Sequence, residues 1–192
     1  MLRKMMKKLL TVLIMCATVC LGATICLGAT VCLGATAKTA TQKPIKPATS
    51  AQLQTFVALY AKSDAAMLRG DVRYLNGILA THFTSRALSG RTSNRTQRVR
   101  NITNLFKKIK VDVSESNIER LGFREKQAFV IVLGTGEFRM RGIDGKPHRV
   151  RVVVRSTDIW ISTNRGWMLQ RTVENEGRQF VDGREVPAGQ RV

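Results

Sequence analysis

Asp158 is a candidate general acid or base, because the pattern of strand residues places it on an apolar face. If residues 144–146 form a hairpin loop, Ile143 pairs with Pro147. Burying an unpaired carboxylate is costly, so Asp158 needs a partner or a raised pKa, which would suit proton transfer near neutral pH. The alternative is a structural role, in which Asp158 only accepts hydrogen bonds. The face predicted by this pairing comprises Val130, Val132, Phe138, Met140, Val150, Val152, Val154, Asp158 and Trp160.

Four arginines are expected together on the opposite face of the same hairpin. The pairing places Arg139 opposite Arg151, and it places Arg141 opposite Arg149. Like charges directly opposed are destabilising unless they are solvated or share an anion. Guanidinium groups bind carboxylates and phosphates bidentately, so these four are candidate anion-binding residues. A solvated outer surface is the alternative.

Other common reaction centres are not indicated. His82 and His148 are the only histidines, and both are expected at the surface rather than as a metal pair. The chain shows no Gly-rich phosphate loop and no Ser-His-Asp order, so neither a metal nor a cofactor is predicted. Gly134 and Gly136 lie within a strand pattern, where they predict a bulge that bends the sheet.

The N-terminal segment is typical of a membrane-targeting leader. Residues 1–8 carry four cations and no acid, and residues 9–37 carry no charge. Small residues at 35–37 suit cleavage before Lys38, which predicts an exported protein, either periplasmic or secreted. A tandem hexapeptide lengthens the uncharged run beyond the roughly 20 residues that span a bilayer, so an uncleaved anchor is the alternative. This segment also contains Cys16, Cys20, Cys26 and Cys32, the only cysteines, so the rest of the chain can form no disulfide.

The chain is strongly basic, with a formal net charge of +19. Such a charge attracts anions, and an anionic envelope component or a small acidic ligand is a possible partner. Nucleic acid is not expected, because no nucleic-acid-binding motif is visible and export removes the usual encounter. Contact with a membrane is expected only through the N-terminal segment. A solvated basic surface without a dedicated partner is the alternative.

Helical patterns dominate the first half of the remaining chain. Residues 38–50 read as a polar linker, and a helix follows from Ala51 until Gly70 stops it. Tyr60 and Asp64 lie one turn apart on the inner face of this helix. Asp71 caps a second, short helix. A third helix is expected over 93–109, with its cations facing water: Arg95, Arg98, Lys107 and Lys108.

Strand patterns dominate the second half. A short extended piece is expected at 83–88, and long strands are separated by turn residues that include Gly122 and Asp144-Gly145. Helices followed by an antiparallel meander predict an α+β domain over 51–180, in which three N-terminal helices pack on one face of a curved, mainly antiparallel sheet. Residues 181–192 read as a tail. The long strand candidates are 111–121, 126–142, 146–163 and 167–180.

Several short segments of the chain occur in the same order as similar segments in the members of one superfamily. They are Gly70-Asp71, Phe83-Thr84, and residues 89–95, 156–160 and 166–169. In this order they resemble the nuclear transport factor 2-like superfamily, in particular its SnoaL-like and ketosteroid-isomerase-like members and the association domain of calcium/calmodulin-dependent kinase. The resemblance covers about residues 51–176, and its motifs specify fold better than activity.

The resemblance implies a cone-shaped barrel with a pocket between the sheet and the helices, and a homodimer as the expected assembly. In ketosteroid-isomerase-like relatives a tyrosine of the first helix polarises a substrate oxygen, so Tyr60 could assist Asp158 in catalysis. A core tyrosine at the pocket rim is the alternative reading of Tyr60. The expected ligand-binding residues are Asp64, Trp160, Phe138 and Met140.

Three functions are therefore open. The first is a protein that binds a small acidic or hydrophobic ligand in the pocket. The second is an enzyme of the isomerase, dehydratase or hydrolase type that uses Asp158 as acid or base. The third is an interaction module whose arginines hold an anionic surface or partner.

Overall fold

A computed structural model describes residues 43–187 of the chain. The predicted leader, its repeat and its cysteines lie outside the described residues, and so do residues 38–42 of the predicted linker and residues 188–192. None of the helices within 43–187 is long and apolar enough to cross a membrane.

The first described helix, α2 (Ser50–Arg69), has defined signals at both ends. Its N-terminus is a capping box, in which the Thr49 hydroxyl accepts the Gln52 backbone N–H and the Gln52 side chain accepts the Thr49 backbone N–H. It ends at Gly70, whose φ of 66° is left-handed. Asp71 then accepts the Tyr74 N–H at 2.9 Å and caps α3 (Val72–Gly77). The predicted stop and cap are both confirmed.

The helix α4 (Arg95–Phe106) is shorter at both ends than the predicted 93–109. Asn94 caps it, and residues before this cap are extended in β3 (Thr92–Asn94). Buried Ala66, Leu75 and Ile102 bring α2, α3 and α4 together in a small core of their own.

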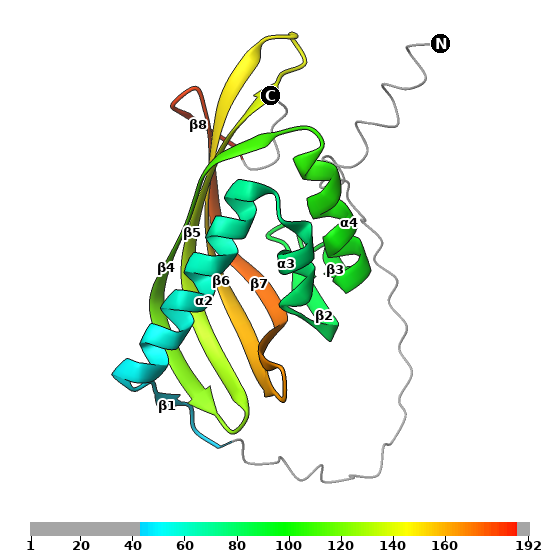
Figure 1. The fold of residues 1–192 in the computed structure, drawn as a ribbon. Helices are drawn as coiled ribbons and strands as arrows, with labels where there is room; N and C mark the ends of the chain where they lie inside the picture. Colours follow the sequence, from blue (N-terminus) through cyan, green and yellow to red (C-terminus); the bar gives the residue numbers. More distant parts are fainter. Residues whose placement is uncertain (1–42, 188–192) are drawn as a thin grey trace, which may run out of the picture. The chain divides into compact units, whose positions relative to one another are not determined.

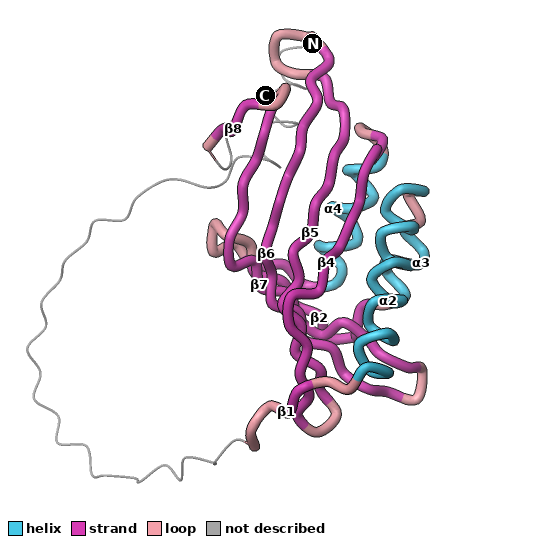
Figure 2. The backbone as a smooth tube through the Cα atoms, turned by 90° about the vertical axis from the view of Figure 1, so that its left-hand side faces the viewer, coloured by secondary structure: helices cyan, strands magenta, loops and turns pink. Residues whose placement is uncertain are grey.

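The strands form one mixed, largely antiparallel sheet, which confirms the α+β class (Figure 1). The strand order is β1-β4-β5-β6-β7-β2-β3, with β8 paired to β7, and only β2 and β7 are parallel neighbours. Helix α2 lies across one face of the sheet, which we call the inner face, and the opposite side is the outer face (Figure 2). The remaining strands are β1 (Lys46–Pro47), β2 (Leu79–Arg86), β4 (Lys110–Arg124), β5 (Gln127–Arg141), β6 (Pro147–Thr163), β7 (Gly166–Val181) and β8 (Arg184–Val186).

Both ends of the predicted domain extend further than expected. Lys46 and Pro47, assigned to the linker, pair with β4 opposite Phe123 and Gly122. Gly122 is therefore a strand residue and not a turn, and a Cβ there would lie 2.5 Å from Ile45 Cγ2. At the other end, the predicted tail contains β8. Asp182 and Gly183 both have positive φ, which matches the turn required by a two-residue hairpin.

The β5–β6 hairpin pairs two residues out of the predicted register. Arg141, not Ile143, lies opposite Pro147, so the loop is longer than three residues, and Met140 lies opposite His148. A shift of two residues preserves the faces of both strands, so Val130, Asp158 and Trp160 still share the inner face. The loop is longer because Gly142 N–H bonds to the Lys146 carbonyl and closes the turn there.

The bulge predicted at Gly134 and Gly136 is a wrong expectation. The strand β5 keeps one continuous register with β6 through Gly134 and Gly136, and the irregularities lie in β4 instead. His148 has a partly exposed side chain, as expected of a surface residue, and its ring nitrogens lie 2.7 Å from Asp182 Oδ2 and 3.1 Å from Asp144 Oδ1. These hydrogen bonds raise the pKa of His148 and join the β5–β6 turn to the β7–β8 turn.

Candidate functional site

The structure brings Tyr60 and Asp158 into direct contact on the inner face. The Tyr60 hydroxyl donates a hydrogen bond of 2.7 Å to Asp158 Oδ2, across 98 positions of sequence. Tyr60 comes from the middle of α2 and Asp158 from the middle of β6, and both side chains are buried. The contact therefore fixes the helix to the centre of the sheet.

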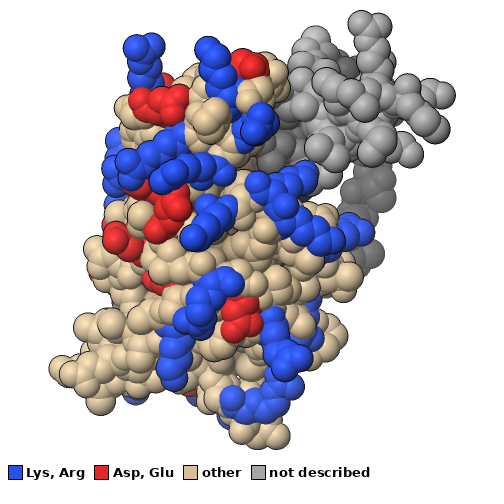
Figure 3. All heavy atoms as spheres, turned by 45° about the horizontal axis from the view of Figure 1, so that its top comes forward, with Lys and Arg blue, Asp and Glu red and all other residues tan. Residues whose placement is uncertain are grey.

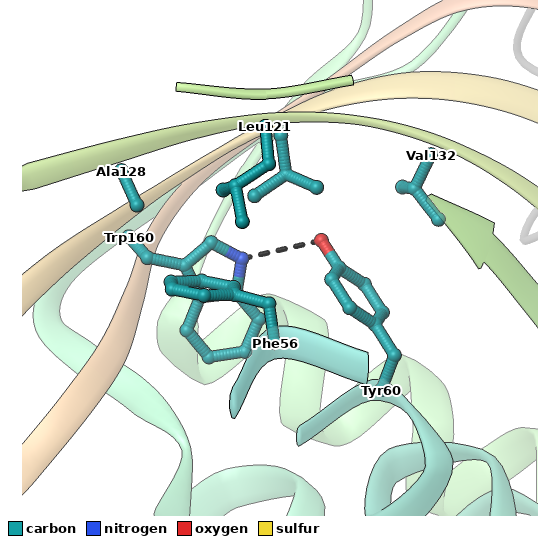
Figure 4. Close-up of a cluster of buried hydrophobic side chains, with 7 residues drawn as sticks. Phe56, Tyr60, Leu121, Ala128, Val132 and Trp160 are labelled. Atoms are coloured by element: carbon teal, nitrogen blue, oxygen red, sulfur yellow. Dashed lines mark hydrogen bonds between the residues drawn. The ribbon is translucent and has the colours of Figure 1, made fainter. Parts of the chain in front are cut away.

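Trp160 completes a hydrogen-bonded chain with this pair. Its indole N–H donates to the Tyr60 hydroxyl oxygen at 3.2 Å, and Figure 4 shows the two side chains pointing toward each other. Phe56, one turn before Tyr60, packs edge-on against Trp160 with ring centroids 5.9 Å apart. Phe56 and Tyr60 of α2 thus form one packed, hydrogen-bonded cluster with Asp158 and Trp160 of β6.

Burial raises the pKa of the Asp158 carboxyl above its ordinary value of 3.8. Hydrogen bonds from Tyr60, Thr172 and Ser156 and the positive charge of Arg98 oppose this effect without cancelling it. Thr172 is the cross-strand partner of Asp158 on β7, and Ser156 precedes it by two positions on the same face. The carboxylate is consequently well bonded and still easier to protonate than an exposed aspartate.

The pKa of Tyr60 is also raised, first by burial and then by the negative charge of Asp158. The tyrosine therefore stays protonated, and its hydroxyl donates a hydrogen bond to Asp158. The hydroxyl has a single hydrogen, so it cannot also donate a hydrogen bond to a substrate oxygen unless that oxygen replaces Asp158 as the acceptor. This arrangement is the hydrogen-bonded core tyrosine of the sequence analysis, with polarisation of a substrate possible only after rearrangement.

A second polar group lies one helical turn further along α2. The Asp64 carboxylate accepts hydrogen bonds from Ser114 at 2.9 Å and from Ser116 at 3.0 Å, and all three side chains are half-buried. The two serines alternate along β4, which places both on the inner face. Asp64 is thus a second inner-face carboxylate that two hydroxyls hold in position.

The inner face between these polar groups has a floor of small residues. Ser116 pairs with Gly134, and Ser114 pairs with Gly136. A Cβ added to Gly134 would meet no described atom, apart from its chain neighbours, closer than the Val154 carbonyl oxygen at 3.8 Å, and Gly136 is similarly open. Side chains of the described residues therefore leave room above these glycines.

Two predicted ligand-binding residues lie far from this site. Phe138 is half-buried opposite Val150, and Met140 lies opposite His148 near the hairpin turn. Phe138 is eight positions along β5 from Val130, the partner of Asp158, which is about 26 Å at 3.3 Å per residue. The structure therefore brings Trp160 and Asp64 to the Tyr60 region, and it does not bring Phe138 and Met140 there.

The arginines of the outer face are arranged differently from the prediction. Arg139 lies opposite Arg149, and Arg151 lies opposite Glu137. Glu137 forms ion pairs with Arg149 and Arg151, while Arg139 pairs with Asp112 at 3.4 Å. Figure 3 shows acidic side chains among the basic ones on the side of the molecule that it presents. Carboxylates thus pair with three of the four guanidinium groups. Within residues 43–187, the fourth, Arg141, bonds only to the Gly145 carbonyl.

Sequence reasoning missed the residues that support the two carboxylates. Ser114 and Ser116 carry a detectable signal, because a polar pair at alternate positions of a half-buried strand needs a partner on the covering helix. Ser156 carries the same signal two positions before Asp158. Arg98 is exposed, as the sequence predicts, and its positive charge also lowers the pKa of Asp158, an effect that the sequence did not indicate. Within residues 43–187, no group of acidic, histidine or cysteine side chains is arranged to hold a metal.

The sequence matches no protein-family model and no curated protein. Solved structures do match the fold. A conserved protein from Planctomyces limnophilus is 10% identical with a TM-score of 0.56, and the match covers 67% of this chain and 98% of that one. A "putative scytalone dehydratase" from Novosphingobium aromaticivorans is 10% identical with a TM-score of 0.56, covering 72% and 91%. A "putative ca/calmodulin-dependent kinase ii association domain" from Exiguobacterium sibiricum is 15% identical with a TM-score of 0.51, covering 73% and 96%.

These similarities show that the chain shares its fold with these solved structures, and an association domain of the kinase type is among the folds that the sequence resemblance predicts. At such low identity they show the fold alone, so the site has to be interpreted from its own residues.

Replacing Tyr60 with Phe should destabilise the protein by about 1–3 kcal/mol, because Asp158 loses a donor and the Trp160 N–H loses its acceptor while both stay buried. Urea unfolding monitored by tryptophan fluorescence measures this loss. Tyr74→Phe is the matched control, since the Tyr74 hydroxyl has no hydrogen bond within residues 43–187, and its effect should stay below about 0.5 kcal/mol. Equal effects of the two variants would contradict the assignment.

The stability difference between wild type and Asp158→Asn should depend on pH. A folded-state pKa above the unfolded value of 3.8 means that protonated Asp158 favours folding, and this contribution is lost as pH rises through the folded pKa. The wild type should therefore lose stability relative to the variant as the pH rises above about 4, as measured by urea unfolding at several pH values. A difference that is constant, or that moves in favour of the wild type, would show that the pKa is not raised.

Proposed function

We propose that the domain binds a small, largely hydrophobic molecule on the inner face of the sheet, between β4–β6 and α2. One observation carries the proposal: beside two well-supported carboxylates, the strand floor consists of half-exposed glycines and serines instead of large side chains. Close-packed interiors are filled, so a floor without side chains, lined by a few fixed polar groups, favours a ligand site.

The electrostatics narrow the class of ligand. Asp64 and Asp158 both present acceptors to the inner face, and the positive charge of Arg98 partly offsets the effect of burial on the pKa of Asp158. Two carboxylates repel an acidic ligand, whereas they accept hydrogen bonds from hydroxyl or amine groups. Of the two ligand types expected from the sequence, a hydrophobic molecule with a hydrogen-bond donor fits this face better than an acidic one.

An acid-base enzyme is the second candidate, and the raised pKa of Asp158 favours it. A carboxyl that is easier to protonate can exchange a proton closer to neutral pH. The isomerase, dehydratase or hydrolase chemistry expected from the sequence would need the ligand to displace the Tyr60 hydroxyl, because Asp158 already accepts its proton. Binding without turnover requires no such displacement, and we rank it first for that reason.

The third candidate, an interaction module on the outer face, has less support. Glu137 and Asp112 already pair with Arg139, Arg149 and Arg151, and an anionic partner would compete with them. Export through residues 1–37 and assembly as a homodimer are further parts of the proposal, and they rest on the sequence and on the resemblance.

Binding of 2-naphthol, a fluorescent aromatic with a single hydroxyl donor, tests the proposed function. Saturable binding is expected, and Gly134→Leu should weaken it by about tenfold or more, because the new side chain occupies the open floor. 2-Methoxynaphthalene, which lacks the donor, should bind more weakly than 2-naphthol.

Thr135→Leu is the matched control for this experiment. It places the same side chain one position along β5, on the outer face, and should leave the affinity unchanged. Affinity for 2-naphthol that survives Gly134→Leu, or an absence of saturable binding to the wild type, would rule out an open inner-face site of this kind.

A further inference from the structure

A separate cleft of about 410 Å³ lies between β2, the start of α4 and the β6–β7 hairpin. Ile161 and Met168 line it and are paired neighbours on β6 and β7. The residues just before them, Trp160 and Trp167, pack into the inner-face core, so Ile161 and Met168 point the other way. The cleft is therefore on the outer face, and neither Tyr60 nor Asp158 lines it.

The cleft forms where β2 parts from β7. Leu79 pairs with Leu169 and Thr84 pairs with Arg171, so four residues of β2 stand opposite Gln170 alone. The register between β6 and β7 shifts at the same place. An irregularity of this kind separates strands and turns side chains in new directions, and such irregularities are frequent beside functional sites.

The lining of this outer cleft is basic and contains no acidic residue. It includes Arg95, Arg165 and His82, and within residues 43–187 none of these three forms an ion pair with a carboxylate. This separates them from the arginines of the β5–β6 hairpin, three of which are neutralised by acids. Two guanidinium groups that pair with no described carboxylate and line a concave surface favour an anionic ligand.

Two donors of the cleft are held in place by other parts of the fold. Arg95, which the sequence analysis assigned to water, is half-buried and donates from Nε and Nη2 to the side chain and the carbonyl of Asn76, both at 3.1 Å. These bonds fix the guanidinium plane and leave Nη1 as a free donor among the described residues. Gln170 accepts from Gln127 through its amide oxygen, which leaves its amide N–H groups for a ligand.

We propose that the outer cleft binds a small organic anion, in which a carboxylate or phosphate is attached to a short apolar chain. The N–H groups of Arg95 and Arg165 would bind the anionic oxygens, since guanidinium groups suit both carboxylate and phosphate. Ile161 and Met168 would contact the apolar chain. The site is independent of the inner-face site and gives the acidic ligand expected from the sequence a place of its own.

Calorimetric titration with hexanoate, 1-hexanol and inorganic phosphate tests both parts of the ligand. Hexanoate should bind more tightly than 1-hexanol, which lacks the charge, and more tightly than phosphate, which lacks the chain. Hexyl phosphate distinguishes the two anionic groups, because it binds more tightly than hexanoate if the cleft prefers a phosphate. Binding of 1-hexanol as tight as that of hexanoate, or no binding of any anion with an apolar chain, would overturn the proposal.

Single substitutions test whether hexanoate binds in the outer cleft. Arg165→Gln, in an exposed turn, should weaken hexanoate binding about tenfold, whereas Arg100→Gln, an equal change of charge on exposed α4, should not. Arg95→Gln should have a similar effect to Arg165→Gln, with urea unfolding as the check that the fold survives. Asp158→Asn should leave hexanoate binding unchanged. Equal losses in Arg165→Gln and Arg100→Gln, or a loss in Asp158→Asn, would show that the anion binds elsewhere.

Discussion

The buried carboxylate of Asp158 is the constraint on which the described fold depends. A charge-bearing group at the centre of a sheet is tolerated only where donors surround it. Tyr60 supplies the closest donor from α2, and Ser156 and Thr172 supply others from the sheet. Because Tyr60 also accepts the Trp160 N–H, one chain of hydrogen bonds sets the position of α2 along the strands.

The same helix repeats this arrangement one turn later, where Asp64 accepts from Ser114 and Ser116. The helical spacing brings Tyr60 and Asp64 to the same side of α2, facing the sheet, and the alternation along β4 brings the two serine hydroxyls to Asp64. The described cations are placed differently, with many of them on the outer face and at the hairpin turns. Acceptors on the inner face and cations on the outer face lead us to assign different ligands to the two sides.

Local sequence signals predicted the elements well. Gly70 and Asp71 determined where α2 ends and α3 begins, and the alternation of β5 and β6 was strong enough that a register error of two residues did not change the inner face. Partners distant in sequence were not predictable in the same way. The contact of Tyr60 with Asp158 spans 98 positions, and the ion pair of Arg149 with Glu137 depends on the true length of the hairpin loop. The outer cleft was missed because it results from mismatched pairing around Gln170, which composition and periodicity do not encode.

A double-mutant cycle between Tyr60 and Asp158 tests the central constraint most directly. Free energies of unfolding would be measured for the wild type, Tyr60→Phe, Asp158→Ala and the double variant. If the buried hydrogen bond couples α2 to the sheet, the sum of the free-energy losses of the two single variants should exceed the loss of the double variant by about 1 kcal/mol or more. Losses that add within about 0.5 kcal/mol would contradict the account, because they would mean that the two side chains stabilise the fold independently.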